Sequence, residues 1–386
     1  MIEGVRMERI YLDHAATTPM HPKVIGKMVE AMNTIFGNPS SIHSFGREAR
    51  HQIDRARAGL ACSIGAKENE IIFTSGGTEA DNMALFGVAE SYQNKGKHII
   101  TSDVEHHAVL HACKKLEKMG YEVTYLPVDE TGRISISEFQ EVLRDDTILV
   151  SIMYGNNEVG SIQPITEIGH LLKDHQAVFH TDAVQAYGIE KIDVNESHID
   201  LLSVSAHKIN GPKGTGFLFA RSNVKLSPRS FGGDQERKRR AGTENVASIV
   251  GFHEAVTIAN EERAPNREKY IGFKEVMLAK LRELDIEFSV NGLLETSLPH
   301  VLNLSFPGTS VEAMLVNLDL AGIAVSSGSA CTAGSIEPSH VLVAMFGKQS
   351  ERLINSIRFS FGLNTTTEDV VKAAEETAKV VLRLKK

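Results

Sequence analysis

Between about residues 70 and 220, short apolar segments alternate with polar or glycine-rich turns and with helical segments. The apolar segments read EIIFTS, HIITSD, EVTYLPV, TILVSIMY, AVFHTD, LLSVSAH and GFLFA. Most of them are almost continuously apolar, which is typical of strands covered on both faces of a sheet. In the helical segment after the first of them, Ala80, Met83, Ala84 and Val88 recur at helical spacing. The alternation therefore predicts an α/β domain with a mostly parallel sheet.

The pattern changes after about residue 260. The charged stretch NEERAPNREKY precedes a helical segment, and the strand-like segments HVLNLSFPG, IAVSSGSAC and SIRFSFG then alternate with further helices. We therefore expect a large domain over residues 17–260 and a smaller α+β domain formed by residues 1–16 and 261–386. Residues 1–6 receive no structural role, because Met7 directly precedes ERIYLDHAATTP and can be a second start site.

Charge and cysteine content exclude several classes of protein. A formal charge of -8 argues against direct binding to nucleic acid, which requires clustered Lys and Arg. No apolar run approaches the roughly 20 residues that cross a bilayer, and no secretory signal is recognisable, so we expect a cytoplasmic protein without membrane contact. Three widely separated cysteines give neither a disulfide framework nor a Cys-x-x-Cys pair, so we expect no metal site.

The segment FTSGGTEADN combines a strand, two glycines and the start of a helix. Backbone N–H groups at such a helix start, with Gly77 and Thr78, can bind a phosphate. A glycine-rich turn with Thr78 as the helix N-cap is an equally good reading of this segment alone.

Four other strand ends carry polar side chains with useful chemistry. Asp182 ends the strand AVFH, where a carboxylate can cap a helix or hold a cationic ring nitrogen. Lys208 follows LLSVSAH at a rigid strand end, whereas most lysines lie on solvated surfaces. His106 and Asn157 follow two further strands, and either residue taken alone is more often a capping group. Because ligands of such sheets gather at the carboxyl ends of the strands, the set favours pyridoxal phosphate as cofactor.

Cys331 lies in SSGSACTAGS, among small residues that offer little bulk to bury it. A structural cysteine is usually packed as a small apolar residue. The helical patterns around Cys62 and Cys113 predict that role for these two, whereas Cys331 has the surroundings of a mobile, reactive thiol.

Ten motifs occur in order between residues 11 and 362: YLDHAATTP, FGNPSSIH, FTSGGTEADN, EHHAVL, NNEVG, HTDAVQ, SAHKINGPKG, RAGTEN, SSGSACTAGS and IRFSFG. On these motifs the chain resembles the fold-type I pyridoxal-phosphate enzymes of the class V aminotransferase group, and more closely the NifS/IscS-type cysteine desulfurases. The resemblance implies L-cysteine as substrate, alanine as product and a homodimer that shares its active sites. It also implies a persulfide that passes to an iron-sulfur scaffold or to a tRNA-thiolating enzyme.

The resemblance further assigns roles residue by residue. It implies that Lys208 forms the Schiff base, that Asp182 pairs with the pyridine nitrogen, that His106 stacks on the ring and transfers protons, and that Gln185 hydrogen-bonds the ring oxygen. The cofactor phosphate would be bound by Gly77, Thr78, Ser205 and His207, and Thr243 would reach the phosphate of the neighbouring subunit's cofactor. Asn157 and Arg358 would bind the substrate carboxylate, and Cys331 would be the nucleophile that takes the sulfur.

Three alternatives stay open from sequence. Cys331 can be incidental in a related lyase or transaminase, such as a selenocysteine lyase, or the fold can serve a non-catalytic sulfur-trafficking subunit. The basic segment QERKRRAG is by default a solvated loop, and otherwise a docking surface for an acidic sulfur acceptor or a tRNA-bound partner. Compared with housekeeping iron-sulfur members, the chain ends without a further C-terminal tail, which leaves delivery to a tRNA-thiolating enzyme as an alternative to delivery to an iron-sulfur scaffold.

Overall fold

The computed structural model describes residues 9–327 and 338–385. Within these residues, the largest sheet has seven strands, which are the seven predicted from the apolar segments. Their order across the sheet is β2 (Ile71–Thr74), β8 (Gly216–Ala220), β7 (Leu201–Ser205), β6 (Val178–Asp182), β5 (Thr147–Ser151), β3 (His98–Ser102) and β4 (Glu122–Leu126). All neighbours are parallel except β8, which is antiparallel to both β2 and β7. The expected mostly parallel α/β sheet is thus confirmed.

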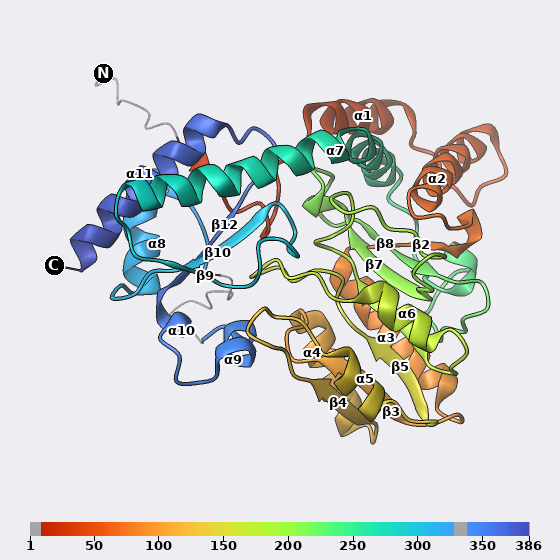
Figure 1. Cartoon of the computed structure of the whole chain (residues 1–386). Coiled ribbons are helices and arrows are strands. Elements are labelled where there is room, and N and C mark those ends of the chain that lie inside the picture. Colours follow the sequence, from red (N-terminus) through yellow and green to blue (C-terminus); the bar gives the residue numbers. More distant parts are fainter. Residues whose placement is uncertain (1–8, 328–337, 386) are drawn as a thin grey trace.

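Helices cover both faces of this sheet (Figure 1). On one face, α3 (Gly77–Tyr92) and α4 (His107–Lys118) pack an apolar cluster that includes Val88 and Cys113. On the other face, α2 (Ser44–Cys62) and α6 (Ile165–Leu172) enclose a second cluster that includes Phe179 and Phe217. α1 (Pro22–Thr34) packs against α7, and α5 (Ile136–Val142) follows β4. Strands buried on both sides explain why their sequences are continuously apolar.

A single helix, α7 (Val246–Glu283), passes from the large sheet to the smaller unit (Figure 1). Its first part buries Phe252 in the core of the large sheet, and its second part buries Met277 in another core. The stretch NEERAPNREKY therefore lies inside a helix that continues past Pro265, and does not precede a new helix as the sequence indicated. None of the described helices is both long and apolar enough to cross a membrane.

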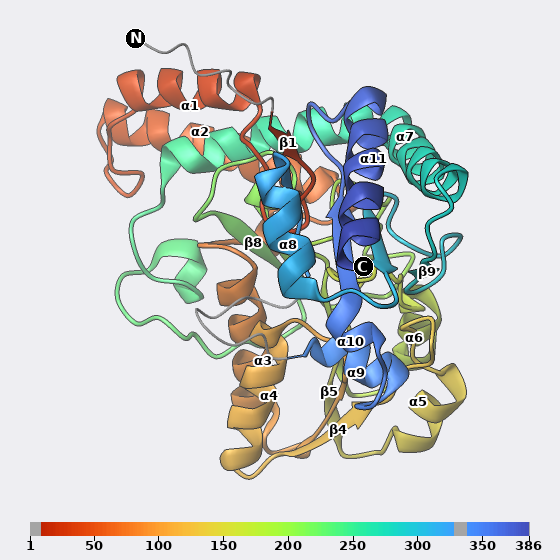
Figure 2. The same cartoon turned by 90° about the vertical axis from the view of Figure 1, so that its left-hand side faces the viewer.

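The smaller unit contains an antiparallel sheet of β12 (Ser356–Ser360), β10 (Val301–Ser305) and β9 (Ser289–Val290). α8 (Val311–Leu320) and α11 (Thr367–Leu384) lie side by side on its outer face (Figure 2). β1 (Ile10–Tyr11) pairs with β11 (Ile323–Ala324), so the start of the described chain packs here as well. α9 (His340–Phe346) and α10 (Arg352–Asn355) complete the described helices. The exact domain boundaries given above remain a prediction.

Candidate functional site

A cavity of about 360 Å³ lies at the carboxyl ends of the central strands. It brings together ten of the twelve site residues predicted from sequence. These are Gly77, Thr78, His106, Asn157, Asp182, Gln185, Ser205, His207, Lys208 and Arg358. Thr243 is not among the lining residues and lies on an exposed loop, and Cys331 falls outside the described residues.

One end of the cavity is the N-terminus of α3. Gly76 is the N-cap residue with φ 143°, a backbone conformation that favours glycine, and the helix begins at Gly77. A Cβ added to Gly77 would lie 2.6 Å from Cγ2 of Val184, so only glycine leaves this surface open. Thr78 is the second helical residue, so its predicted role as N-cap is wrong. The first N–H groups of a helix have no intrahelical partner, which suits this end for an anion.

The basic segment around Arg240 is tied to this same helix start. Arg240 donates from Nε to Glu79 at 2.8 Å, and the Glu79 carboxylate also accepts from the Ser75 backbone at 2.6 Å. Deeper in the protein, Arg57 donates twice to the buried Glu236, both times at 2.7 Å. The prediction of a solvated loop is therefore wrong for Glu236 and Arg240, although Arg237 and Lys238 are exposed.

Lys208 lies in a short 3₁₀ turn, Ala206–Lys208, which directly follows β7. Its Nζ donates to the carbonyls of Ala15 and Ala16 at 2.5 and 2.8 Å. Burial and the nearby charge of Arg358 lower the pKa of Lys208 to about 8. About a tenth of this amine is therefore neutral at pH 7, far more than for an ordinary lysine, and the neutral form is the one that a nucleophile or a base requires.

Asp182 and Asp81 form a pair of buried carboxyl groups in the cavity floor. Asp182 accepts a hydrogen bond from the Val184 backbone at 2.9 Å, and burial raises its pKa. Burial and the charge of Asp182 also raise the pKa of Asp81, whose Oδ1 has no hydrogen-bond partner among the described residues. Oxygen atoms of both residues and a ring nitrogen of His106 all lie within 4.8 Å of one another. Two buried acids around so small a space favour a cation such as a protonated ring nitrogen.

Sequence reasoning missed Asp81, although a signal was present. Asp81 lies three residues before Ala84 and seven before Val88, which places a charged residue on the buried face of α3. Groups spaced as these three can also ligate a metal ion. The amine of Lys208 and the anion-binding helix end fit an organic phosphate cofactor better than a metal alone.

His106 is the N-cap residue of α4, and its Nδ1 accepts from the Ala108 backbone at 3.1 Å. His207 also lines the cavity, and its Nδ1 is hydrogen-bonded to the hydroxyl of Thr17 at 3.0 Å. Burial and the charge of Lys208 lower the pKa of His207 to about 4, so the ring is neutral. Like Asp81, Thr17 is a residue near the cavity that the sequence did not indicate; it contacts His207.

Arg358 is buried and reaches the cavity from β12. It donates to the Asn157 carbonyl at 2.9 Å and to the carboxylate of Asp13 at 2.8 Å. Its Nε has no hydrogen-bond partner among the described residues. A cation held in this way at a cavity wall is suited to a carboxylate ligand. Asp13 was not among the predicted residues.

The two described cysteines differ from each other. Cys113 is buried in α4, where burial raises the pKa of its thiol to about 12, so the predicted packing role is confirmed. Cys62 is exposed at the end of α2, so the prediction that it packs is wrong.

Comparisons with known proteins agree with this geometry. The class-V aminotransferase family matches residues 10–372. The putative cysteine desulfurase IscS 1 of Bacillus subtilis (strain 168) is 64% identical over 98% of this chain and 100% of the relative. The cysteine desulfurase IscS of Dictyoglomus turgidum is 47% identical over 97% and 95% of the two chains. Among solved structures, a NifS-like protein has a TM-score of 0.91 and 35% identity, covering 97% of this chain and 100% of that one. SspA in complex with cysteine has a TM-score of 0.80 and 35% identity, with coverage of 91% and 98%.

Proposed function

Because this chain belongs to the class-V aminotransferase family and is a pyridoxal-phosphate-dependent cysteine desulfurase, we propose that Cys331 takes the sulfur of L-cysteine as a persulfide. The observation that supports this activity most is a single cavity that contains Lys208, Asp182 and Arg358. An amine, a buried acid and a carboxylate-binding cation are the three groups that such a reaction on an amino acid requires.

The residues of the cavity fit the cofactor from end to end. Its phosphate would lie at the start of α3, where a Cβ on Gly77 has no room, with further donors on Thr78, Ser205 and His207. Asp182 would hold the ring nitrogen and Gln185 the ring oxygen, with His106 against the ring face. When bound, pyridoxal phosphate supplies a conjugated ring that accepts the electron pair left by the substrate's α-proton.

The protein side chains then orient the substrate and move its protons. Arg358 binds the substrate carboxylate, and Asn157, whose backbone carbonyl accepts from Arg358 at 2.9 Å, lines the same cavity. The neutral Nζ of Lys208, whose pKa is lowered to about 8, takes the α-proton and returns it later.

The sulfur transfer itself is a displacement at the substrate sulfur. The Cys331 thiolate attacks this sulfur, an S–S bond forms and the C–S bond breaks. The electron pair of the C–S bond stays with carbon, which takes a proton to give alanine. Only the thiolate is a competent nucleophile, so a neighbouring base must take its proton. His106, an exposed residue that lines the cavity, is our candidate for that base.

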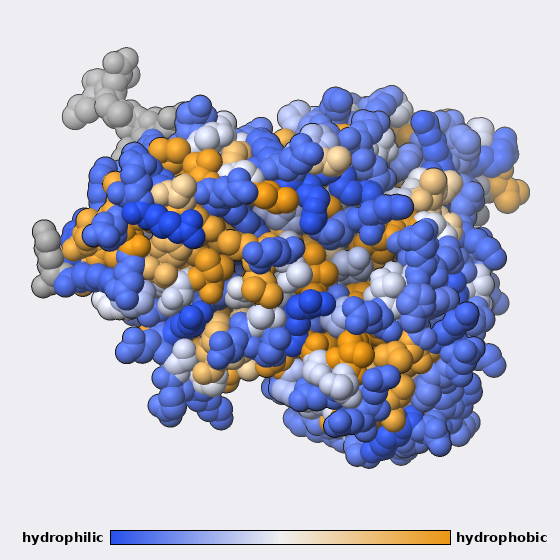
Figure 3. All heavy atoms as spheres, viewed as in Figure 1, coloured by the Kyte–Doolittle hydropathy of each residue, from blue (hydrophilic) through white to orange (hydrophobic). Residues whose placement is uncertain are grey.

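We further propose a homodimer with a shared site. Exposed apolar residues protrude around the connection from α1 to α2 (Figure 3), including Phe36 at 75% and Ile42 at 91% exposure. Phe231, in the loop that leads to Thr243, is 87% exposed. Such patches are rare on monomers unless they bind a partner, so a second copy is expected to cover them. Thr243 would then reach the cofactor phosphate in the neighbouring copy.

Replacing Ile42 and Phe231 with Asp tests the homodimer. The double variant should be a monomer that retains the cofactor poorly.

The sulfur acceptor is expected to be an iron-sulfur scaffold or a tRNA-thiolating enzyme in the cytoplasm. The IscS names of the relatives support the first of these. Incubating the persulfide-loaded enzyme with each candidate acceptor, and following labelled sulfur, distinguishes the two.

The deciding experiment replaces Cys331 with Ala. The variant should remain yellow, because the cofactor site is intact, and should fail to transfer sulfur from L-cysteine to a protein acceptor. Cys62→Ala is the matched control, because Cys62 is an exposed thiol that does not line the cavity. Normal persulfide transfer by Cys331→Ala would contradict the proposal. Retained turnover of L-selenocysteine with loss of L-cysteine turnover would instead favour a selenocysteine lyase.

A further inference from the structure

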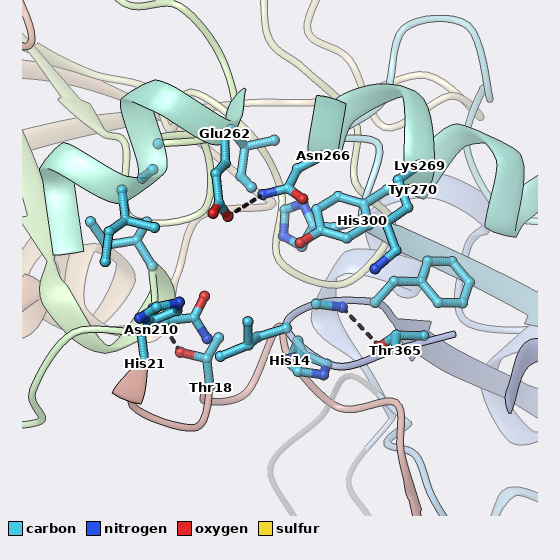
Figure 4. Close-up of a pocket in the computed structure, with 18 of the residues that line it drawn as sticks. His14, Thr18, His21, Asn210, Glu262, Asn266, Lys269, Tyr270, His300 and Thr365 are labelled. Atoms are coloured by element: carbon cyan, nitrogen blue, oxygen red, sulfur yellow. Dashed lines mark hydrogen bonds between the residues drawn. The ribbon is translucent and has the colours of Figure 1, made fainter. Parts of the chain in front are cut away.

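Lys208 lines a second cavity in addition to the one described above. This cavity, of about 320 Å³, lies beneath α7 and contains His300, a buried residue just before β10 (Figure 4). His300 extends from the wall of this cavity towards Gln185, and the distance from its Nε2 to Gln185 Oε1 is 3.3 Å. One imidazole therefore connects the second cavity to a residue of the proposed cofactor site.

The orientation of the Gln185 amide follows from its other neighbour. Gln185 Nε2 lies 2.9 Å from the carbonyl oxygen of Ala15, and a carbonyl can only accept a hydrogen bond. The NH₂ group must therefore face Ala15, which leaves Oε1 facing His300. Because Oε1 can only accept, Nε2 of His300 must carry the proton.

The surroundings of His300 agree with that tautomer. Burial and the charge of Lys274 lower the pKa of His300 to about 3, so the ring is neutral and carries a single proton. Its Nδ1 is buried and has no hydrogen-bond partner among the described residues, which is consistent with a ring nitrogen that carries no proton.

We propose that His300 is a positioning residue that fixes the amide of Gln185 by donating from Nε2 to its oxygen. Together with the Ala15 carbonyl, it holds both ends of the amide. One N–H of Gln185 is used by Ala15, and the second is left for the ring oxygen of the cofactor. The same Ala15 carbonyl accepts from Lys208, so the contacts run from His300 through Gln185 and Ala15 to the reactive amine. The inference rests on the cofactor role of Gln185 proposed above.

The test uses the visible absorption band of the cofactor in the purified holoenzyme and measures the midpoint pH at which this band changes as the bound cofactor loses a proton. A hydrogen bond to the ring oxygen stabilises the negative charge on that oxygen and so favours the deprotonated cofactor. A misplaced Gln185 should therefore raise the midpoint pH. We expect His300→Phe to raise it by about 0.5 pH unit or more, which is about a threefold change in the equilibrium constant. His300→Gln places an amide NH₂ near the position of Nε2 and should restore most of the shift.

A double-mutant cycle separates the positioning role from a general effect on packing. If His300 acts through Gln185, then His300→Phe should add no further shift to a Gln185→Leu variant. Additive shifts, or an unchanged band in His300→Phe, would overturn the proposal, as would a His300→Gln variant as disturbed as His300→Phe. A Gln185→Leu variant with the wild-type midpoint would instead refute the cofactor role of Gln185, and a wild-type protein without a visible band would refute the proposed function.

Discussion

The guanidinium of Arg358 lies 2.8 Å from the carboxylate of Asp13, which ties β12 to the segment that follows β1. A backbone bridge between Asp13 and Ser360 fixes the same junction. The cation that we propose to bind the substrate carboxylate is thus oriented by a residue from near the other end of the chain.

Replacing Asp13 with Asn should weaken substrate binding more than catalysis. The variant keeps an acceptor for Arg358 but loses the charge, and a charge-assisted hydrogen bond contributes about 1.5–3 kcal/mol. We expect the KM for L-cysteine to rise about tenfold and kcat to change much less. Steady-state kinetics checks this, and the cofactor content serves as control, because Asp13 does not line the cofactor cavity. An unchanged KM would show that Arg358 is held without Asp13.

The rate at which cofactor-free enzyme binds pyridoxal phosphate covalently should rise with pH. Only the neutral amine of Lys208 attacks an aldehyde, and raising the pH deprotonates it. Because its pKa is lowered to about 8, the rate should be half-maximal near that pH. Stopped-flow absorbance over about pH 6 to 12 measures this. Lys208→Ala should form no band and the exposed Lys225→Ala should behave as wild type, whereas a midpoint near 10.5 would refute the lowered pKa.

Gly77→Ala should lower the affinity for pyridoxal phosphate by at least about tenfold, because a Cβ here approaches Val184 to 2.6 Å and displaces the phosphate end. Removing the clashing methyl group in a Gly77→Ala, Val184→Ala double variant should restore much of the affinity. Gly272→Ala, in open space on α7, is the matched control and should stabilise the fold by about 0.5–1 kcal/mol. Equal affinities for wild type and Gly77→Ala would show that the phosphate lies elsewhere.

Glu236→Gln should destabilise the protein by about 3 kcal/mol, because it leaves the buried guanidinium of Arg57 without its counter-charge. Urea unfolding of the cofactor-free protein at neutral pH measures this difference. Arg237→Gln, at an exposed neighbouring position, should change stability by less than about 0.5 kcal/mol. If both variants unfold at the same urea concentration, Glu236 does not stabilise the loop.

The central sheet and the side chains at its strand ends were predictable because the signals are local. Each strand is a continuous apolar run, and Asp182 and Lys208 lie at or directly after the ends of such runs. Parallel strands bring these ends to one edge, so the predicted parallel direction of the strands was enough to gather the side chains.

The missed residues depend on contacts between distant parts of the chain. Asp13 meets Arg358 and His300 meets Gln185 only after the two cores have packed together. No local pattern distinguishes these residues from ordinary polar ones. Likewise, the charged stretch around Pro265 resembled a boundary, because its helix is held by burial of Phe252 and Met277 on either side rather than by its own sequence.

The continuous helix α7 sets how the molecule can deform. Because Phe252 is buried in one core and Met277 in the other, the continuous helix between them fixes the distance between the two cores. No flexible linker lies at this crossing for a hinge to use. Opening the cavity by moving the smaller unit would bend an intact helix. We therefore expect sulfur transfer by this enzyme to depend on local movements of loops, while the two cores keep their relative positions.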